Sequence, residues 1–310
     1  MRRRVEKSTN VRDIPEAEFD WNEIPSPLLN LNATLRSGQC FRWRQDTCHI
    51  WWGTVEKTAI ALWQDPYNPN ASLLWQTFPE LNRGAFVRDY LRLNVDLEAL
   101  YSDWIATEPR MTEVIEKYKG LRILRQPPEE CFFAFLCASC NTVVKIERSV
   151  FRLSERYGEP IEVPRGVCFA FPTMEALAEA EEQALRADLW GYRAPRVIAL
   201  AKELSGRPKG WLRGLREVEH SAARAELVQL YGIGSKLADC ICLFCLDKDS
   251  ATPVDTHIWQ LTCRLFRPDL VGKSLTPRVY SEIEQEWQGR FGDYAGWAQQ
   301  YLFLGELDHH

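Results

Sequence analysis

The sequence has 310 residues, 45% hydrophobic and 26% charged, which is typical of a globular protein of about two domains. Its 38 basic and 43 acidic residues give a net charge of −5, so it is not a strongly basic protein as a whole. No apolar run approaches the ~20 residues that a membrane-spanning helix needs, and the basic N-terminus lacks the apolar stretch of a secretory signal.

The N-terminal part is expected to form an antiparallel sheet. From residue 29 to about 78 the pattern is strand-like, and residues 49–55 and 58–63 are rich in β-branched and aromatic side chains. Only two residues, 56–57, separate these runs, which predicts a hairpin. Residues 73–75 are predicted as a further strand.

After residue 79 the hydrophobic period changes from 2 to 3.6, which predicts a mainly helical remainder. Prolines followed by acids at 127–130 are typical of a helix start and predict a long helix over 129–156. The other predicted helices are 82–92, 96–106, 111–118, 174–181, 182–189, 194–204, 221–230, 236–246, 256–265, 277–289 and 294–306.

These elements predict an α+β fold with four parts. They are a polar tail at 1–20, a mixed domain with an antiparallel sheet at 21–128, a helical domain at 129–306 and a short tail at 307–310. The ten cysteines lie partly within apolar helical patterns, which favours buried thiols and a reducing, intracellular setting.

Residues 225–242 predict two helices joined by a glycine-containing turn. Gly232 and Gly234 permit a tight turn and the close approach of another backbone. The N–H groups at the start of the second helix form an anion site, with Ser235 as its predicted N-cap. Such a hairpin can bind a DNA phosphate without reading sequence, although an ordinary helix connection has the same pattern.

Lys236 lies at the positive end of the second helix, where an ammonium group is disfavoured. Partial burial would lower its pKa further below ~10.4, and a nucleophilic lysine needs a neutral amine. A solvated or phosphate-pairing lysine is the alternative. Cys240 follows one turn later on the same face, either as a neighbour of whatever Lys236 contacts or as a packed core thiol.

Asp255 directly precedes a predicted helix and is therefore expected to be its N-cap. Capping does not exclude catalysis, since a carboxylate close to Lys236 could stabilise a developing cation. His257 is expected either to contact a phosphate or to pack within the protein.

Four separated motifs resemble, in their order along the chain, the eukaryotic-type 8-oxoguanine DNA glycosylases of the helix-hairpin-helix superfamily. They are GIGSK at 232–236 with Val254-Asp255 nineteen residues after the lysine, SGQCFRW at 37–43, GYRA at 191–194, and YAGWAQQYLF at 294–303. The resemblance covers residues 21–306. It implies a mostly helical helix-hairpin-helix glycosylase fold with an N-terminal antiparallel sheet.

The resemblance also implies a reaction. The damaged base is flipped out of the duplex into a pocket, and Lys236 attacks C1′ of its sugar. The base leaves, a Schiff base remains, and β-elimination nicks the strand 3′ to the lesion. Asp255 matches the carboxylate that stabilises positive charge on the sugar.

Four residues match the pocket for the flipped base. The carbonyl of Gly38 accepts a hydrogen bond from N7–H of 8-oxoguanine, whereas normal guanine has a bare acceptor there, and an unpaired polar group in a dry pocket costs ~1–3 kcal/mol. Phe303 and Cys240 sandwich the base, and Gln299 reads its Watson–Crick edge. Taken singly, Gly38 reads as a simple turn and Phe303 as core packing.

Further residues match contacts to DNA. His257 matches a phosphate contact, Tyr192 the wedge in the vacated stack, and Arg193 a reader of the orphaned cytosine. Gly232 and Gly234 form the phosphate-binding hairpin. Taken singly, Tyr192 is an ordinary surface aromatic residue.

The chain departs from the family pattern in two places. Relatives carry an asparagine run followed by an arginine where this sequence has Cys140, Asn141 and, last, Lys145. Cys140 cannot make the paired hydrogen bonds of an amide, and Lys145 cannot present a planar fork. We therefore expect a relaxed preference for the base opposite the lesion, with Asn141 and Lys145 still at the DNA. Tyr231 replaces the usual proline, which is expected to change the stiffness of the hairpin.

The implied partner is double-stranded DNA containing 8-oxoguanine, bound by a monomer with no membrane association. The expected location is the nucleus in a eukaryote, or the cytoplasm and nucleoid in a bacterium. No cofactor or metal is expected, because only Cys263 follows Asp255 and a four-cysteine iron–sulfur cluster cannot form there.

Two other functions are considered. One is a glycosylase of the same fold for another lesion, against which Gly38 and Phe303 argue. The other is a non-catalytic DNA-damage binding protein, against which the joint presence of Lys236 and Asp255 argues.

Overall fold

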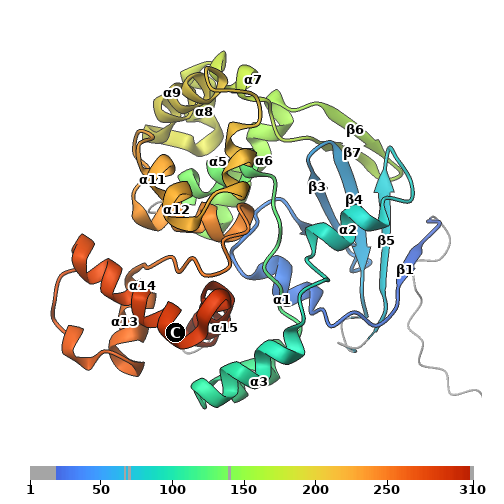
Figure 1. The fold of residues 1–310 in the computed structure, drawn as a ribbon. Helices are drawn as coiled ribbons and strands as arrows, with labels where there is room; N and C mark the ends of the chain where they lie inside the picture. Colours follow the sequence, from blue (N-terminus) through green and yellow to red (C-terminus); the bar gives the residue numbers. More distant parts are fainter. Residues whose placement is uncertain (1–18, 66–67, 69–70, 139–140, 308–310) are drawn as a thin grey trace, which may run out of the picture.

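An antiparallel sheet and a larger set of helices make up the structure, a computed structural model that describes residues 19–65, 68, 71–138 and 141–307 (Figure 1). The sheet lies on one side, and the C-terminal helices form a separate group on the other. The predicted α+β fold, mostly helical with an N-terminal antiparallel sheet, is confirmed. None of the described helices is long and apolar enough to cross a membrane.

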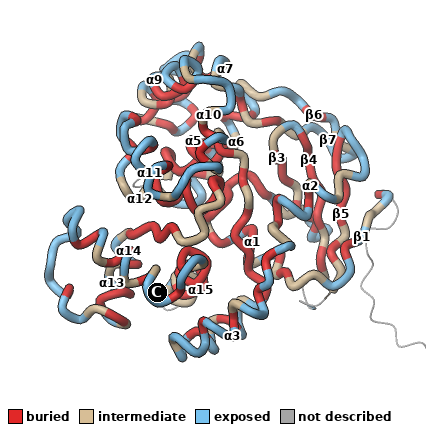
Figure 2. Tube along the Cα trace, viewed as in Figure 1, coloured by how far each residue is buried: buried red, intermediate tan, exposed pale blue. Residues whose placement is uncertain are grey.

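The main sheet has the strand order β1-β5-β4-β3-β2, and all its neighbours are antiparallel. Its strands are β1 (Asn22–Ile24), β2 (Arg44–Gln45), β3 (Trp51–Val55), β4 (Thr58–Trp63) and β5 (Leu73–Phe78). The predicted hairpin at 56–57 is confirmed, because Val55 pairs with Thr58. Central strand β4 is buried along most of its length, which explains its nearly continuous apolar sequence (Figure 2).

The helices of the N-terminal half are α1 (Leu31–Arg36), α2 (Gly84–Tyr90), α3 (Leu97–Thr107), α4 (Met111–Tyr118), α5 (Pro128–Ala138) and α6 (Val143–Tyr157). Helix α1 falls within the stretch predicted to be strand-like, so that prediction is wrong there. The Asn30 side chain accepts a hydrogen bond from the Ala33 amide at 2.9 Å, and this local cap starts a helix where the hydrophobic pattern does not indicate one.

The C-terminal half contains α7 (Met174–Ala178), α8 (Glu182–Leu185), α9 (Ala194–Ser205), α10 (Trp211–Gly214), α11 (His220–Val228), α12 (Ser235–Cys245), α13 (Thr256–Leu265), α14 (Pro277–Phe291) and α15 (Ala295–Leu307). Short turns of π or 3₁₀ helix are η1 (Arg186–Trp190), η2 (Gly191–Arg193), η3 (Leu215–Glu217), η4 (Pro268–Leu270) and η5 (Gly292–Tyr294). All the predicted helices of this half are present, with ends shifted by a few residues.

The long helix predicted over 129–156 is wrong, because the chain forms two helices, α5 and α6, there. Thr142 has an extended backbone (φ −86°, ψ 149°), which a continuous helix does not allow. The side chain of Asn141 donates to the Cys137 carbonyl at 3.3 Å and accepts from the Thr142 amide at 3.1 Å. Asparagine and threonine compete for backbone groups in this way and favour helix ends.

A second antiparallel hairpin, β6 (Pro160–Val163) with β7 (Gly166–Phe169), lies between α6 and α7 and was not predicted. Ile161 of β6 packs in one apolar cluster with Ile50, which directly precedes β3, and with Ala59 of β4. The helical part of the chain therefore also covers the sheet.

A buried ion pair joins the sheet to the helices. Arg42 donates to both carboxylate oxygens of Glu130 on α5, at 2.9 and 2.6 Å, and also to the carbonyls of Thr54 and Phe169. Because both charged groups are almost fully buried and hydrogen-bonded, they fix the segment around Arg42 against α5. This segment begins at the turn that contains Gly38.

Candidate functional site

The glycine-containing turn between α11 and α12 is a tight hairpin. Gly232 has φ +78°, a conformation that side-chain-bearing residues rarely adopt, and Ile233 is buried as an apolar anchor between the helices. Gly234 is the N-cap of α12 with an extended backbone, and Ser235 is already the first helical residue. The predicted N-cap role of Ser235 is therefore wrong. The free N–H groups of the first turn remain available to an anion.

Lys236 and Asp255 line one cavity of about 400 Å³, although the segment between them leaves α12 and crosses to α13 (Figure 1). Asp255 is the N-cap of α13, and its carboxylate accepts a hydrogen bond from the Ile258 amide at 2.9 Å. The predicted cap is confirmed. Capping fixes the carboxylate at the cavity wall, so structural and electrostatic roles are compatible.

The pKa of Lys236 is raised above its ordinary value. Its interaction with Cys240 is the largest cause and the charge of Asp255 also raises the pKa, while burial opposes both. Our expectation of a lowered pKa, and hence of a neutral amine in the free protein, is wrong, because the neighbouring groups outweigh burial. The ammonium group lies 5.9 Å from the ring centroid of Phe135, a second favourable contact.

The four residues predicted for the base pocket, Gly38, Cys240, Gln299 and Phe303, all line the same cavity as Lys236 and Asp255. Asn141 and His257 line it as well. The aromatic side chains that complete the wall were not predicted; they are Phe41, Phe135 and Phe244. The rings of Phe135 and Phe244 stack with their centroids 5.3 Å apart. The cavity thus has an apolar wall suited to a flat ring.

The turn that contains Gly38 is held by side-chain amides on both sides. Gln300 of α15 donates to the Ser37 carbonyl at 2.9 Å, and Gln126 donates to the Gln39 carbonyl at 2.6 Å. Among the described residues no donor reaches the carbonyl of Gly38, whose φ is +78°. The carbonyl of Gly38 is therefore a free hydrogen-bond acceptor at the cavity, between the hydrogen-bonded carbonyls of Ser37 and Gln39.

Several buried side chains carry donors that have no partner among the described residues, among them Trp75, Thr252 and Trp259, and two of them belong to predicted site residues. They are Nε2 of Gln299, inside the cavity, and Nε and Nη2 of Arg193, outside it. Because an unpaired buried donor is costly, each indicates a place where an external acceptor is expected.

The remaining predicted DNA contacts lie outside the cavity. Tyr192 is 61% exposed on the kinked segment η1–η2, and the Arg193 guanidinium lies 4.4 Å from its ring centroid. Lys145 is exposed on the first turn of α6. Gly232 and Gly234 are exposed at the hairpin. Cys140 lies outside the described residues.

Sequence reasoning missed Gln300, Gln126 and the aromatic wall. Gln300 lies in the quoted motif YAGWAQQYLF beside Gln299, so the motif was the available signal. Phe41 lies in the quoted motif SGQCFRW, whereas Phe135 and Phe244 gave no signal of their own, because phenylalanines in apolar helices usually belong to the core.

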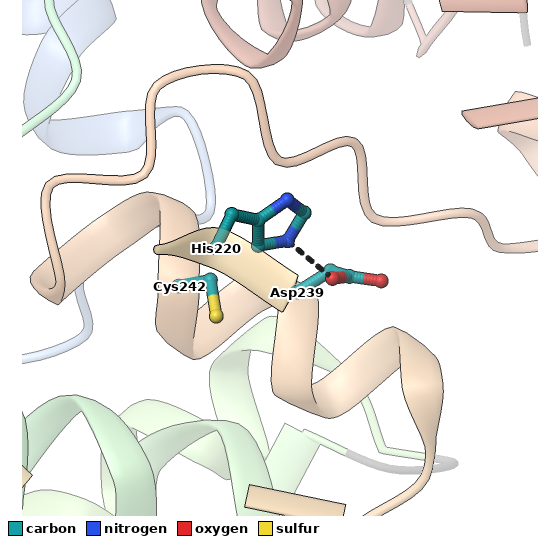
Figure 3. A group of neighbouring side chains, drawn as sticks. All are labelled: His220, Asp239 and Cys242. Carbon is teal, nitrogen blue, oxygen red and sulfur yellow. Dashed lines mark hydrogen bonds and ion pairs between the residues drawn. The ribbon is translucent and has the colours of Figure 1, made fainter. Parts of the chain in front are cut away.

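One further group of side chains could hold a metal ion. It consists of His220 of α11 and Asp239 and Cys242 of α12, whose ligand atoms lie within 4.8 Å of one another (Figure 3). Asp239 is already paired: it accepts from the Tyr280 hydroxyl at 2.6 Å, bonds to His220 at 3.1 Å, and has Arg224 at 3.5 Å. Burial raises the pKa of the Cys242 thiol, which disfavours the thiolate that a metal needs. We interpret the group as a buried network that fixes α12 against α11 and α14.

Two family profiles match consecutive parts of the chain. Residues 23–132 match the N-terminal domain of 8-oxoguanine DNA glycosylase, and residues 134–286 match the HhH-GPD superfamily of base excision DNA repair proteins.

Similar proteins cover most of the chain. The N-glycosylase/DNA lyase OGG1 of Arabidopsis thaliana is 36% identical over 284 residues, which is 90% of this chain and 78% of that protein. The N-glycosylase/DNA lyase of Saccharomyces cerevisiae is 29% identical over 90% of this chain and 84% of that protein. The structure of MBOgg1 in complex with a low-affinity DNA ligand matches with a TM-score of 0.80 and 26% identity, covering 94% of this chain and 99% of that one.

Proposed function

The chain belongs to the HhH-GPD superfamily of base excision DNA repair proteins and carries the N-terminal domain of the 8-oxoguanine DNA glycosylases, and we propose that Lys236 and Asp255 perform its chemistry. It is a DNA glycosylase with lyase activity that binds DNA and excises 8-oxoguanine. One observation supports the residue assignment above all others: an amine and a carboxylate line one cavity with the four residues that match the base pocket.

In the proposed reaction, an ammonium group has no lone pair and the pKa of Lys236 is raised, so Lys236 must first give up a proton to solvent. The Nζ lone pair then forms a bond to C1′ while the bond from C1′ to the base breaks. The base leaves with the bonding electrons and takes up a proton. Asp255 stabilises the positive charge that develops on the sugar. Ring opening yields the Schiff base. In the β-elimination that follows, C2′ loses a proton, its bonding electrons form a double bond to C3′, and the bond from C3′ to the phosphate oxygen breaks with the phosphate as leaving group.

We assign recognition of the base to two groups without a hydrogen-bond partner, the carbonyl of Gly38 and Nε2 of Gln299. The Gly38 carbonyl would accept from N7–H of 8-oxoguanine, which normal guanine lacks. The unpaired Nε2 of Gln299 would donate to the Watson–Crick edge. Phe303 and Cys240 would enclose the ring from its two faces.

A panel of lesion duplexes tests this function. In single-turnover reactions, 8-oxoguanine is expected to leave at least ~100-fold faster than guanine, an alkylated purine or an oxidised pyrimidine, because only it satisfies the Gly38 acceptor. If another lesion is excised faster than 8-oxoguanine, that lesion is the preferred substrate and the assignment of 8-oxoguanine is wrong. DNA binding without any excision would favour the non-catalytic alternative.

We also propose a relaxed preference for the opposite base. Lys145 replaces an arginine and cannot form a bidentate fork, whereas Arg193 keeps two unpaired donors for a cytosine. Losing one bidentate contact removes ~1–3 kcal/mol of discrimination. Excision rates opposite C, A, G and T are therefore expected to lie within about tenfold, and Lys145→Arg is expected to widen the range. A preference for C above ~100-fold in the wild type would contradict this.

The proposed unit is a monomer that acts inside the cell, in the nucleus or, in a bacterium, at the nucleoid. The described cysteines are all free thiols, which fits a reducing compartment.

A further inference from the structure

Arg196 of α9 lies directly against the tip of the hairpin. Its guanidinium carbon is 5.3 Å from the ring centroid of Tyr231, and a Cβ built on Gly232 would come within 2.7 Å of the same carbon. A side chain at 232 would therefore have to displace the guanidinium from this position. Tyr231 is 66% exposed, so its ring is accessible at the surface of the hairpin.

The charge of Arg196 is not balanced by an acid. Within the described part of the chain, its side chain has no ion pair and no hydrogen-bond acceptor. Arg207, which follows the end of the same helix, differs: it pairs with both Glu203 and Glu226. An unbalanced guanidinium held beside an anion-binding hairpin is suited to a phosphate, which it can contact with two parallel hydrogen bonds.

We propose that Arg196 is a DNA phosphate-binding residue of this protein and that Tyr231 holds it in place by stacking. The inference rests on the proposed function, since it takes the duplex to lie against the hairpin. It also connects two parts of the interface, because Arg196 belongs to the helix that follows Tyr192 and Arg193. The phosphate contact of Arg196 would thus be connected through α9 to Tyr192 and Arg193, the residues assigned to the opposite base.

The test is the salt dependence of DNA binding, measured by fluorescence anisotropy. The probe is a duplex with a tetrahydrofuran abasic analogue, which offers no base to excise and no Schiff base. Arg196→Gln is expected to weaken binding about tenfold and to reduce the slope of log K against log salt by about 0.9, the effect of one lost phosphate contact.

Matched variants separate binding from folding. Lys202→Gln removes one exposed charge from the same helix and is expected to leave affinity and slope unchanged. Tyr231→Ala is expected to weaken binding and Tyr231→Phe to preserve it, and Tyr231→Ala and Arg196→Gln together should be less than additive. Arg196→Lys should retain the wild-type slope.

An unchanged slope in Arg196→Gln, or an equal loss in Lys202→Gln, would overturn the proposal. The slope does not depend on excision. A wild type that fails to release 8-oxoguanine would therefore refute the proposed substrate while leaving this measurement interpretable.

Discussion

Replacing Lys236 with glutamine is expected to abolish base excision and, with it, the covalent adduct that borohydride traps between protein and DNA. An amide nitrogen has no available lone pair for C1′, so no Schiff base forms. We expect a rate loss of about 10⁴-fold or more, the range seen when an enzyme loses its nucleophile. Single-turnover cleavage of an 8-oxoguanine duplex and denaturing electrophoresis after borohydride treatment measure the two effects.

Lys202→Gln provides the control for this substitution, because it changes the charge equally on an exposed face of α9. It should trap as much DNA as the wild type. If Lys236→Gln still forms the adduct, another amine is the nucleophile and the assignment of the site fails.

The second large effect is expected for Asp255→Asn. This substitution removes the charge but keeps an oxygen that can accept from the Ile258 amide, so the cap of α13 survives. Loss of electrostatic stabilisation of the sugar cation is expected to slow excision by about 10²- to 10³-fold. Affinity for the abasic-analogue duplex should change by less than about threefold, because a carboxylate does not attract phosphate.

Asp255→Ala distinguishes catalysis from capping. It removes both charge and cap, so it should also lower the stability of the protein by about 1 kcal/mol, measurable as a lower melting temperature. If Asp255→Asn and the wild type excise the base at equal rates, Asp255 acts only as the N-cap of α13 and has no catalytic role. A large loss of DNA affinity in Asp255→Asn would lead to the same conclusion.

Local sequence was sufficient for most elements. Hairpin β3–β4 and helices such as α9, α13 and α14 follow from periodicity and end residues, which act within a few positions along the chain. Local rules failed where short-range hydrogen bonds competed with the pattern. Asn30 starts α1 inside a strand-like stretch, and Asn141 with Thr142 divides the predicted long helix.

The order of the motifs indicated the family, and the resemblance named eight of the 21 residues that line the cavity. It did not indicate what holds them. The amides of Gln300 and Gln126 fix the turn of Gly38, and the Arg42–Glu130 pair joins that turn to α5 across 88 residues. Such contacts depend on groups far apart in the chain, for which periodicity contains no information.

The sequence by itself therefore determined the fold class and the hairpin and led to the proposal of Lys236 and Asp255, since these follow from local patterns and family motifs. Only the tertiary structure decided the direction in which the pKa of Lys236 shifts, the free acceptor at Gly38 and the position of Arg196 beside the hairpin. The physical reason is that a pKa, an unsatisfied hydrogen bond and an unbalanced charge are set by neighbours in space.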